Sequence, residues 1–210
     1  MRVRSAFARL PLDEKLNVAT HGLGLVLSII GIPILLWSAD VYCSSNELIG
    51  VLIFSLGLVM VYTSSTGYHY VTGIVKHRWR IFDHISIYFL IGGTYAAYVL
   101  KHLDLSLACM FLAVQWAIIF ASIIFKLFYT GKFDLLSTLL YVGLGLMVVT
   151  IVEPLMASVP YEVMIWLLVG GLSYLIGVVF YLLEKYRFAH PIWHLFVLGG
   201  STCHFVGLFY

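Results

Sequence analysis

Seven apolar stretches separated by short polar segments make up most of this chain. Each is about 20 residues long, the length that an α-helix needs to cross the hydrocarbon core of a bilayer. No stretch alternates apolar and polar residues, as the strands of a transmembrane barrel do. The pattern predicts an all-α integral membrane protein, a bundle of seven transmembrane helices, with spans at 18–39, 48–71, 83–101, 105–125, 134–153, 161–183 and 191–210.

Composition supports this prediction. Hydrophobic residues make up 62% of the 210 positions and charged residues only 10%, whereas a soluble domain has roughly a quarter charged residues. The mean hydropathy of +1.01 excludes a water-soluble protein. The predicted loops are short, so residues 18–210 form a single membrane domain, preceded by a cytoplasmic segment at 1–17. That segment lacks the apolar core of a signal peptide, and we expect it to lie on the membrane surface.

The basic residues predict an orientation. Only Lys101 falls on one side of the predicted membrane, and the other Lys and Arg residues fall on the opposite side. Because cytoplasmic loops are enriched in Lys and Arg, the N-terminus is predicted to be cytoplasmic and the C-terminus to be outside. The cytoplasmic set is Arg2, Arg4, Arg9, Lys15, Lys76, Arg78, Arg80, Lys126, Lys132, Lys185 and Arg187.

Three histidines are predicted to share one depth near the cytoplasmic side. His69 ends the second span, and His190 and His194 begin the seventh, one helical turn apart. Three histidines and a water would complete the open tetrahedral arrangement of a catalytic zinc site. The alternative is that each histidine forms a hydrogen bond to a neighbouring helix.

Two further polar residues lie at the same depth. Ser65 is one turn before His69, and Asp83 begins the third span. Ionisable groups inside a membrane are costly and usually functional. Asp83 would hold the water or accept its proton, and the Ser65 hydroxyl would form a hydrogen bond to the water or to a substrate carbonyl.

A polar stripe opens the first span. Glu14, Asn17 and His21 recur at i, i+3 and i+7 and share one helix face. A polar face that enters a membrane must contact protein. The stripe either supports the metal ligands from behind or fixes the first span to the bundle, and both readings stay open.

The other histidines are not expected to bind the metal. His77 and His102 fall in loops, where we expect them to be solvated, and His84 is expected to serve packing. His204 follows His194 by ten residues, about 15 Å along a helix, and is expected to form an interhelical hydrogen bond.

Small residues complete the pattern. Cysteines 43, 109 and 203 are scattered, and no disulfide is predicted. Four glycine clusters are expected to permit close helix contact: Gly92–Gly93, Gly143–Gly145, Gly170–Gly171 and Gly199–Gly200.

The motifs resemble those of the hemolysin III family, which belongs with the progestin and adipoQ receptors and, more widely, with the alkaline ceramidases. The matching motifs are Glu14-x-x-Asn17-x-x-Thr20-His21, Ser65-x3-His69, Asp83 and His190-x3-His194. This resemblance implies that the three histidines bind Zn²⁺ and that the aspartate and serine position a zinc-bound water.

The chain departs from the relatives at one segment of the third span. Relatives often have Thr-Tyr-Thr-Pro where this chain has Thr94-Tyr95-Ala96-Ala97, so a proline kink is absent. We expect no counterpart of the long cytoplasmic domain of the receptors, and their hormone signalling is not transferred.

These observations favour a zinc-dependent hydrolase of a membrane lipid amide, similar to a ceramidase, in the plasma membrane of a bacterium. The alternative is a non-enzymatic regulator of membrane lipids in which zinc is structural. A pore-forming cytolysin is disfavoured, since a secreted toxin needs a soluble state. The expected partner is a membrane lipid, as substrate or ligand, and no nucleic-acid partner is expected.

Overall fold

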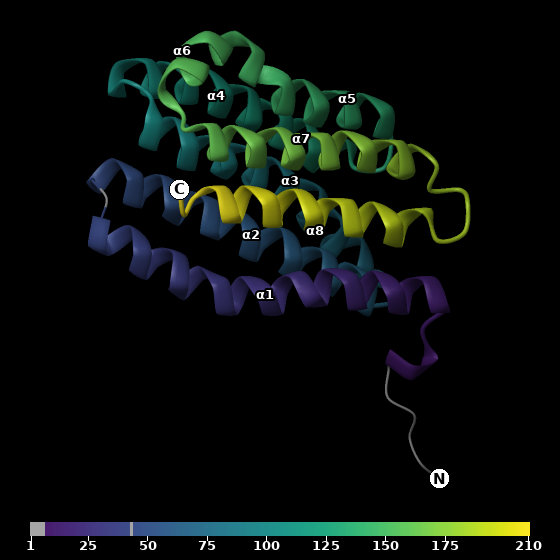
Figure 1. The fold of residues 1–210 in the computed structure, drawn as a ribbon. Coiled ribbons are helices and arrows are strands. Elements are labelled where there is room, and N and C mark those ends of the chain that lie inside the picture. The colour runs from purple at the N-terminus through teal and green to yellow at the C-terminus, as the bar shows by residue number, and fades with distance from the viewer. Residues whose placement is uncertain (1–6, 43) are drawn as a thin grey trace.

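The computed structural model describes residues 7–42 and 44–210, and it is helical with no strand in those ranges. Long helices lie side by side, and α1 begins at the opposite end of the bundle from the end of α8 (Figure 1). We call the end where α1 begins the histidine end. The elements are η1 (Phe7–Arg9), α1 (Leu12–Tyr42), α2 (Ser45–Tyr70), α3 (Ile74–His102), α4 (Leu105–Tyr129), α5 (Asp134–Gly145), η2 (Leu146–Ile151), α6 (Val152–Ser158), α7 (Tyr161–Leu182) and α8 (Ala189–Gly207).

The helices confirm an integral membrane protein. Five helical segments within the described ranges are long and apolar enough to cross a membrane: Leu12–Ser38, Ser45–Tyr70, Leu105–Tyr129, Asp134–Ser158 and Tyr161–Leu182. Helices α3 and α8 fall short of that apolar character because charged residues stand near both ends of α3 and because α8 contains three histidines and three glycines. The count of seven membrane crossings and the orientation of the termini stay predictions.

Two helices begin more than one helical turn before the predicted spans. Helix α1 begins at Leu12, so the stripe that includes Glu14 is helical. Helix α3 begins at Ile74, directly after Gly73, whose φ of +71° turns the chain away from α2. Residues 76–80, predicted to lie in a loop, are therefore helical. Within the predicted segment 1–17, residues 1–6 lie outside the described ranges.

The fifth predicted span, 134–153, is broken in the structure. Helix α5 ends at Gly145, the 3-10 segment η2 follows, and α6 continues to Ser158. The Tyr95 hydroxyl of α3 donates to the Gly145 carbonyl at 2.5 Å and accepts from the Val148 amide at 2.8 Å. It therefore satisfies backbone groups that the change of helix type frees, which lipid could not do.

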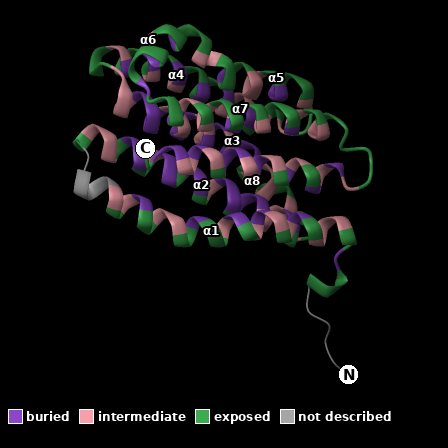
Figure 2. Ribbon diagram, viewed as in Figure 1, coloured by how far each residue is buried: buried purple, intermediate pink, exposed green. Residues whose placement is uncertain are grey.

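The core lies between α2, α3 and α8, whose inward faces are the most buried (Figure 2). Helices α2 and α3 meet backbone to backbone. A Cβ atom at Gly57 would lie 2.8 Å from the Phe89 carbonyl oxygen, and one at Gly93 would lie 2.8 Å from the Ile53 carbonyl oxygen. These glycines therefore behave as the sequence predicts for the Gly92–Gly93 pair.

A candidate metal centre

Three histidine side chains meet at the histidine end of the bundle. His69 is in the last turn of α2, and His190 and His194 are in the first two turns of α8. Each offers one ring nitrogen, and these nitrogens lie within 4.8 Å of one another. His69 and His194 are buried, and the Nε2 atom of His69 has no hydrogen-bond partner. The donor set therefore fits one metal ion.

The opposite nitrogen of His69 contacts the polar stripe of α1. Its Nδ1 lies 2.6 Å from Glu14 Oε2, and Glu14 Oε1 accepts from the Lys76 ammonium at 2.8 Å. When Nδ1–H donates to the carboxylate, Nε2 keeps its lone pair for a metal. The Asn17 amide also lies 3.2 Å from Nδ1, and its oxygen can face the ring because the two amide orientations are interchangeable.

His194 is oriented in a similar way by Thr20. The Thr20 hydroxyl donates to the backbone carbonyl of Leu16 or Asn17, at 2.9 and 3.0 Å. Its oxygen lies 3.1 Å from His194 Nδ1. Since the hydroxyl hydrogen is used by the backbone, the oxygen can accept from Nδ1–H, which leaves Nε2 of His194 available.

His190 is held less firmly than the other two histidines. Its Nδ1 lies 4.0 Å from Glu184 Oε2, beyond hydrogen-bond length, and its side chain is 24% exposed. Phe188, just before α8, adopts a left-handed backbone with φ of 66°. This turn places His190 in the first turn of the helix.

His21 stacks on His194 instead of joining the cluster. The ring centroids are 3.6 Å apart, and the ring planes differ by 15°. Both His21 nitrogens are buried without a hydrogen-bond partner. The ring covers one face of a proposed ligand and thereby limits its movement.

Asp83 and Ser65 border the same region from α3 and α2. The Ser65 hydroxyl is buried and makes no hydrogen bond. Asp83 is half-buried, and the His69 ring and the Ser65 hydroxyl are among the polar groups that act on its carboxylate. Two oxygen-bearing side chains thus lie beside the histidines.

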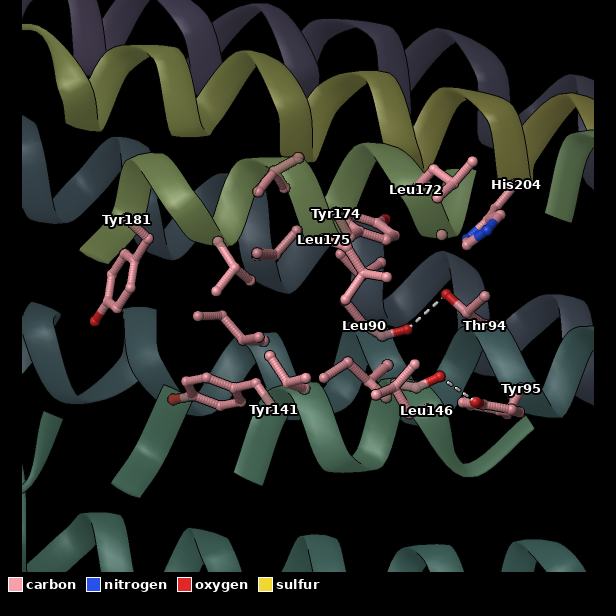
Figure 3. A pocket seen from close by; sticks show the side chains of 18 of the residues that line it. Leu90, Thr94, Tyr95, Tyr141, Leu146, Leu172, Tyr174, Leu175, Tyr181 and His204 are labelled. Atoms are coloured by element: carbon pink, nitrogen blue, oxygen red, sulfur yellow. Dashed lines mark hydrogen bonds between the residues drawn. The ribbon is translucent and has the colours of Figure 1, made fainter. Parts of the chain in front are cut away.

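A cavity of about 430 Å³ extends from this region through the bundle. Its histidine end is lined by Ser65, Asp83, His190 and His194. Most of the remaining lining is apolar, and side chains of α7 and α8 face those of α3, α5 and η2 across it (Figure 3). Along α7 the lining runs from Met164 to Tyr181, about 25 Å at 1.5 Å per residue.

Some glycines of the predicted clusters pack against a neighbouring helix, and others border open space. Gly170 and Gly200 approach side chains of the neighbouring helix, as predicted. The prediction was wrong for Gly143, Gly145 and Gly171, where a Cβ atom would meet nothing within 4 Å. Gly145 and Gly171 line the cavity instead.

The contacts of two polar residues, Thr20 and Lys126, were not predicted from the sequence. Thr20 extends the stripe of Glu14 and Asn17 by a further three residues, and that spacing could have indicated it. Lys126 was predicted to lie in a loop but is buried in α4, where its ammonium lies 3.0 Å from His84 Nδ1. Nothing local in the sequence signals that pair.

The histidines outside the cluster have different environments. His77 is exposed, as expected, but His102 is half-buried at the end of α3. His204 donates from Nε2 to the Leu167 carbonyl of α7 at 3.3 Å, which confirms an interhelical hydrogen bond. Among the described cysteines, Cys109 and Cys203 are free, and Cys43 lies outside the described ranges.

Comparison with known proteins decides the family. A family model described as haemolysin-III related matches residues 11–205. The chain belongs to the haemolysin III family. The matched region includes every proposed site residue from Glu14 to His194, which confirms the resemblance seen in the motifs.

Relatives in the haemolysin III family are similar over nearly their whole length. The chain is 38% identical to a hemolysin-3 homolog of Bacillus subtilis (strain 168) over 194 residues, covering 92% of this chain and 91% of that protein. It is 36% identical to hemolysin-3 of Bacillus cereus, covering 92% and 89%. It is also 28% identical over 204 residues to the human monocyte to macrophage differentiation factor, covering 93% and 83%. The bacterial relatives support a location in a bacterial plasma membrane.

Proposed function

We propose that this protein is a zinc-dependent hydrolase that cleaves an amide bond in a membrane lipid of the ceramide type. His69, His190 and His194 would hold the ion. When bound, zinc would act as a Lewis acid that activates water near neutral pH. The ions of magnesium and calcium prefer oxygen ligands, so a donor set of three imidazoles favours zinc.

The main support for a lipid substrate is the apolar cavity that begins beside these histidines. One leaflet of a bilayer has a hydrocarbon thickness of roughly 15 Å, half of the whole core. The cavity lining along α7 is longer than that, so it has room for a lipid chain whose carbonyl lies at the histidine end. A water-soluble substrate would leave an apolar space of this length unfilled.

Asp83 and Ser65 would handle protons and the carbonyl group. A water oxygen attacks the amide carbon, and Asp83 accepts a water proton. The carbon–nitrogen bond then breaks, and Asp83 returns the proton to the leaving nitrogen, which gives a fatty acid and an amine. The Ser65 hydroxyl, which lies beside the Asp83 carboxylate, would donate to the carbonyl oxygen.

The α1 stripe would support the metal ligands. Lys76 orients Glu14, Glu14 orients the His69 ring, and Thr20 orients the His194 ring. Partners of this kind fix the ring orientation and tautomer of ligating histidines.

Hydrolysis of a ceramide panel by the zinc-loaded protein tests the proposal, with Asp83→Asn as the matched variant. We expect fatty acid release from the wild type and its loss in Asp83→Asn, with zinc content unchanged. If the wild type released no fatty acid while a known ceramidase did so in parallel, the hydrolase would be rejected. Zinc would then be structural, as in a non-enzymatic regulator of membrane lipids.

A further inference from the structure

A second polar group of side chains lies in the cavity, far from the metal centre. Tyr174 of α7, His204 of α8 and Thr94 of α3 line it among leucines and valines (Figure 3). His204 follows His194 by ten residues on one helix, so the two rings are about 15 Å apart along the axis. This group therefore cannot serve the same metal ion.

His204 presents an acceptor in this group. Its Nε2–H donates to the Leu167 carbonyl at 3.3 Å, so Nδ1 bears the lone pair. The side chain is 6% exposed, and Nδ1 is buried without a partner. A buried acceptor in apolar surroundings is unfavourable unless a donor meets it.

Tyr174 presents a donor beside it. Its hydroxyl is buried and makes no hydrogen bond, and its ring centroid lies 5.5 Å from that of His204. The neighbouring Ser201 hydroxyl already donates to the Leu198 carbonyl and is bonded to Tyr62. Ser201 is a competing acceptor for the Tyr174 hydrogen, but the two hydroxyls form no hydrogen bond of ordinary geometry, so this hydrogen is available to a group in the cavity.

Two glycines hold these rings in place. A Cβ atom at Gly170 of α7 would collide with the His204 ring, and one at Gly200 of α8 would lie 2.8 Å from the Tyr174 ring. Each ring thus sits against the bare backbone of the neighbouring helix. The donor and the acceptor are fixed before any ligand arrives, which favours specific binding.

We propose that Tyr174 and His204 form a binding site for a hydroxyl group on the chain of the bound lipid. A hydroxyl group can accept from the Tyr174 O–H and donate to His204 Nδ1 at the same time, which neither a methylene nor a carbonyl group can do. This inference deepens the proposed function, because it assumes that a lipid chain occupies the cavity with its head at the metal centre. The preferred substrates are then hydroxylated in the distal part of the acyl chain.

Ricinoleic acid and oleic acid are suitable probes, because the first differs from the second by a hydroxyl group past the middle of the chain. Binding of both to the detergent-purified, zinc-loaded protein is measured by native mass spectrometry. We expect ricinoleic acid to bind roughly tenfold more tightly than oleic acid, because one or two buried hydrogen bonds provide a gain in affinity of about this size. Tyr174→Phe, which removes only the hydroxyl oxygen, should abolish the preference.

Tyr181→Phe is the matched control, since Tyr181 belongs to the same helix and lines the same cavity nearer the histidine end. It should retain the preference for ricinoleic acid. Equal binding of the two acids by the wild type would overturn the proposal, and so would a preference that survives Tyr174→Phe.

The readout is binding, so failure of the hydrolase is distinguishable from failure of this site. A preference for ricinoleic acid in a protein that hydrolyses no amide would keep the hydroxyl site and reject the enzyme. Amide hydrolysis with no such preference would keep the enzyme and reject the hydroxyl site.

Discussion

The contact between α2 and α3 differs sharply from the wall that α5, η2 and α7 build around the cavity. At the first, backbones touch through Gly57 and Gly93, and a single added methyl group would collide with main-chain atoms. At the cavity wall, Gly145 and Gly171 border open space, and the chain between α5 and α6 forms the 3-10 segment η2.

The difference separates two tasks within one bundle. The proposed metal ligand His69 and the proposed proton acceptor Asp83 come from the tightly packed pair, where neighbouring atoms fix their positions. The wall provides space for a chain of variable shape. Rigid helices near the chemistry and looser ones around the ligand are a sensible division, since catalytic geometry tolerates little displacement.

The largest expected effect is on hydrolysis and concerns Asp83, which lies on the tightly packed helix α3. Asp83→Asn should lower hydrolysis by roughly 10²- to 10⁴-fold, because the amide cannot accept the water proton. Zinc content and thermal stability should stay at the wild-type level, since the substitution preserves shape. Fatty acid release and metal analysis on the same sample check both points. Glu162→Gln, an exposed change on α7, is the control and should leave hydrolysis unchanged.

The next effect concerns the support of the metal from α1. Glu14→Gln removes the charge that accepts from His69 and from Lys76. Zinc affinity should fall roughly 10- to 100-fold, as is typical for residues that orient metal ligands. Competition with a zinc chelator measures it, with Glu162→Gln again as the control. Unchanged affinity would mean that Glu14 only fixes α1 to the bundle.

Two glycine-to-alanine substitutions test the contrast between the α2–α3 contact and the cavity wall. Gly93→Ala should destabilise the protein by about 1–3 kcal/mol, because the new methyl group is forced against the backbone of α2. Gly171→Ala should be neutral or stabilising by up to about 1 kcal/mol, because alanine favours the helix and the space is open. Unfolding in detergent monitored by circular dichroism gives both values. Equal destabilisation by the two changes would refute the contrast between the α2–α3 contact and the cavity wall.

The smallest effect is expected at the wall. Tyr95→Phe removes the hydroxyl that bonds Gly145 and Val148. We expect a loss of about 1 kcal/mol, since hydrogen bonds between membrane helices are individually modest. The same unfolding measurement checks it, with the exposed Tyr161→Phe as the control. A Tyr95→Phe protein as stable as the wild type would show that η2 needs no support from α3.

Much of the helical framework could be predicted from the sequence because it depends on local apolar patterns. The break at η2 could not be predicted, because its segment, residues 146–151, is apolar apart from Thr150 and its partner Tyr95 lies some fifty residues earlier. The helical period predicts from the sequence that His190 and His194 lie on one helix face. That His69 meets them depends on how α2 packs near α8, which no local pattern contains.

The stripe of α1 illustrates the same limit. Its period showed that Glu14, Asn17 and His21 share a face, but not which residue each would contact. The structure divides them: Glu14 and Asn17 lie against His69, and His21 stacks on His194. The role of each at a metal site stays a prediction until metal is measured.

The zinc content of the purified protein is the most direct test of zinc binding by the three histidines. The variant is His194→Ala, and the control is His77→Ala, which changes an exposed histidine of α3. We expect one zinc ion per chain in the wild type and in His77→Ala, and its loss in a folded His194→Ala. Zinc binding by these histidines would be refuted by a folded wild type that binds no zinc after incubation with the ion, or by a His194→Ala protein that retains it fully.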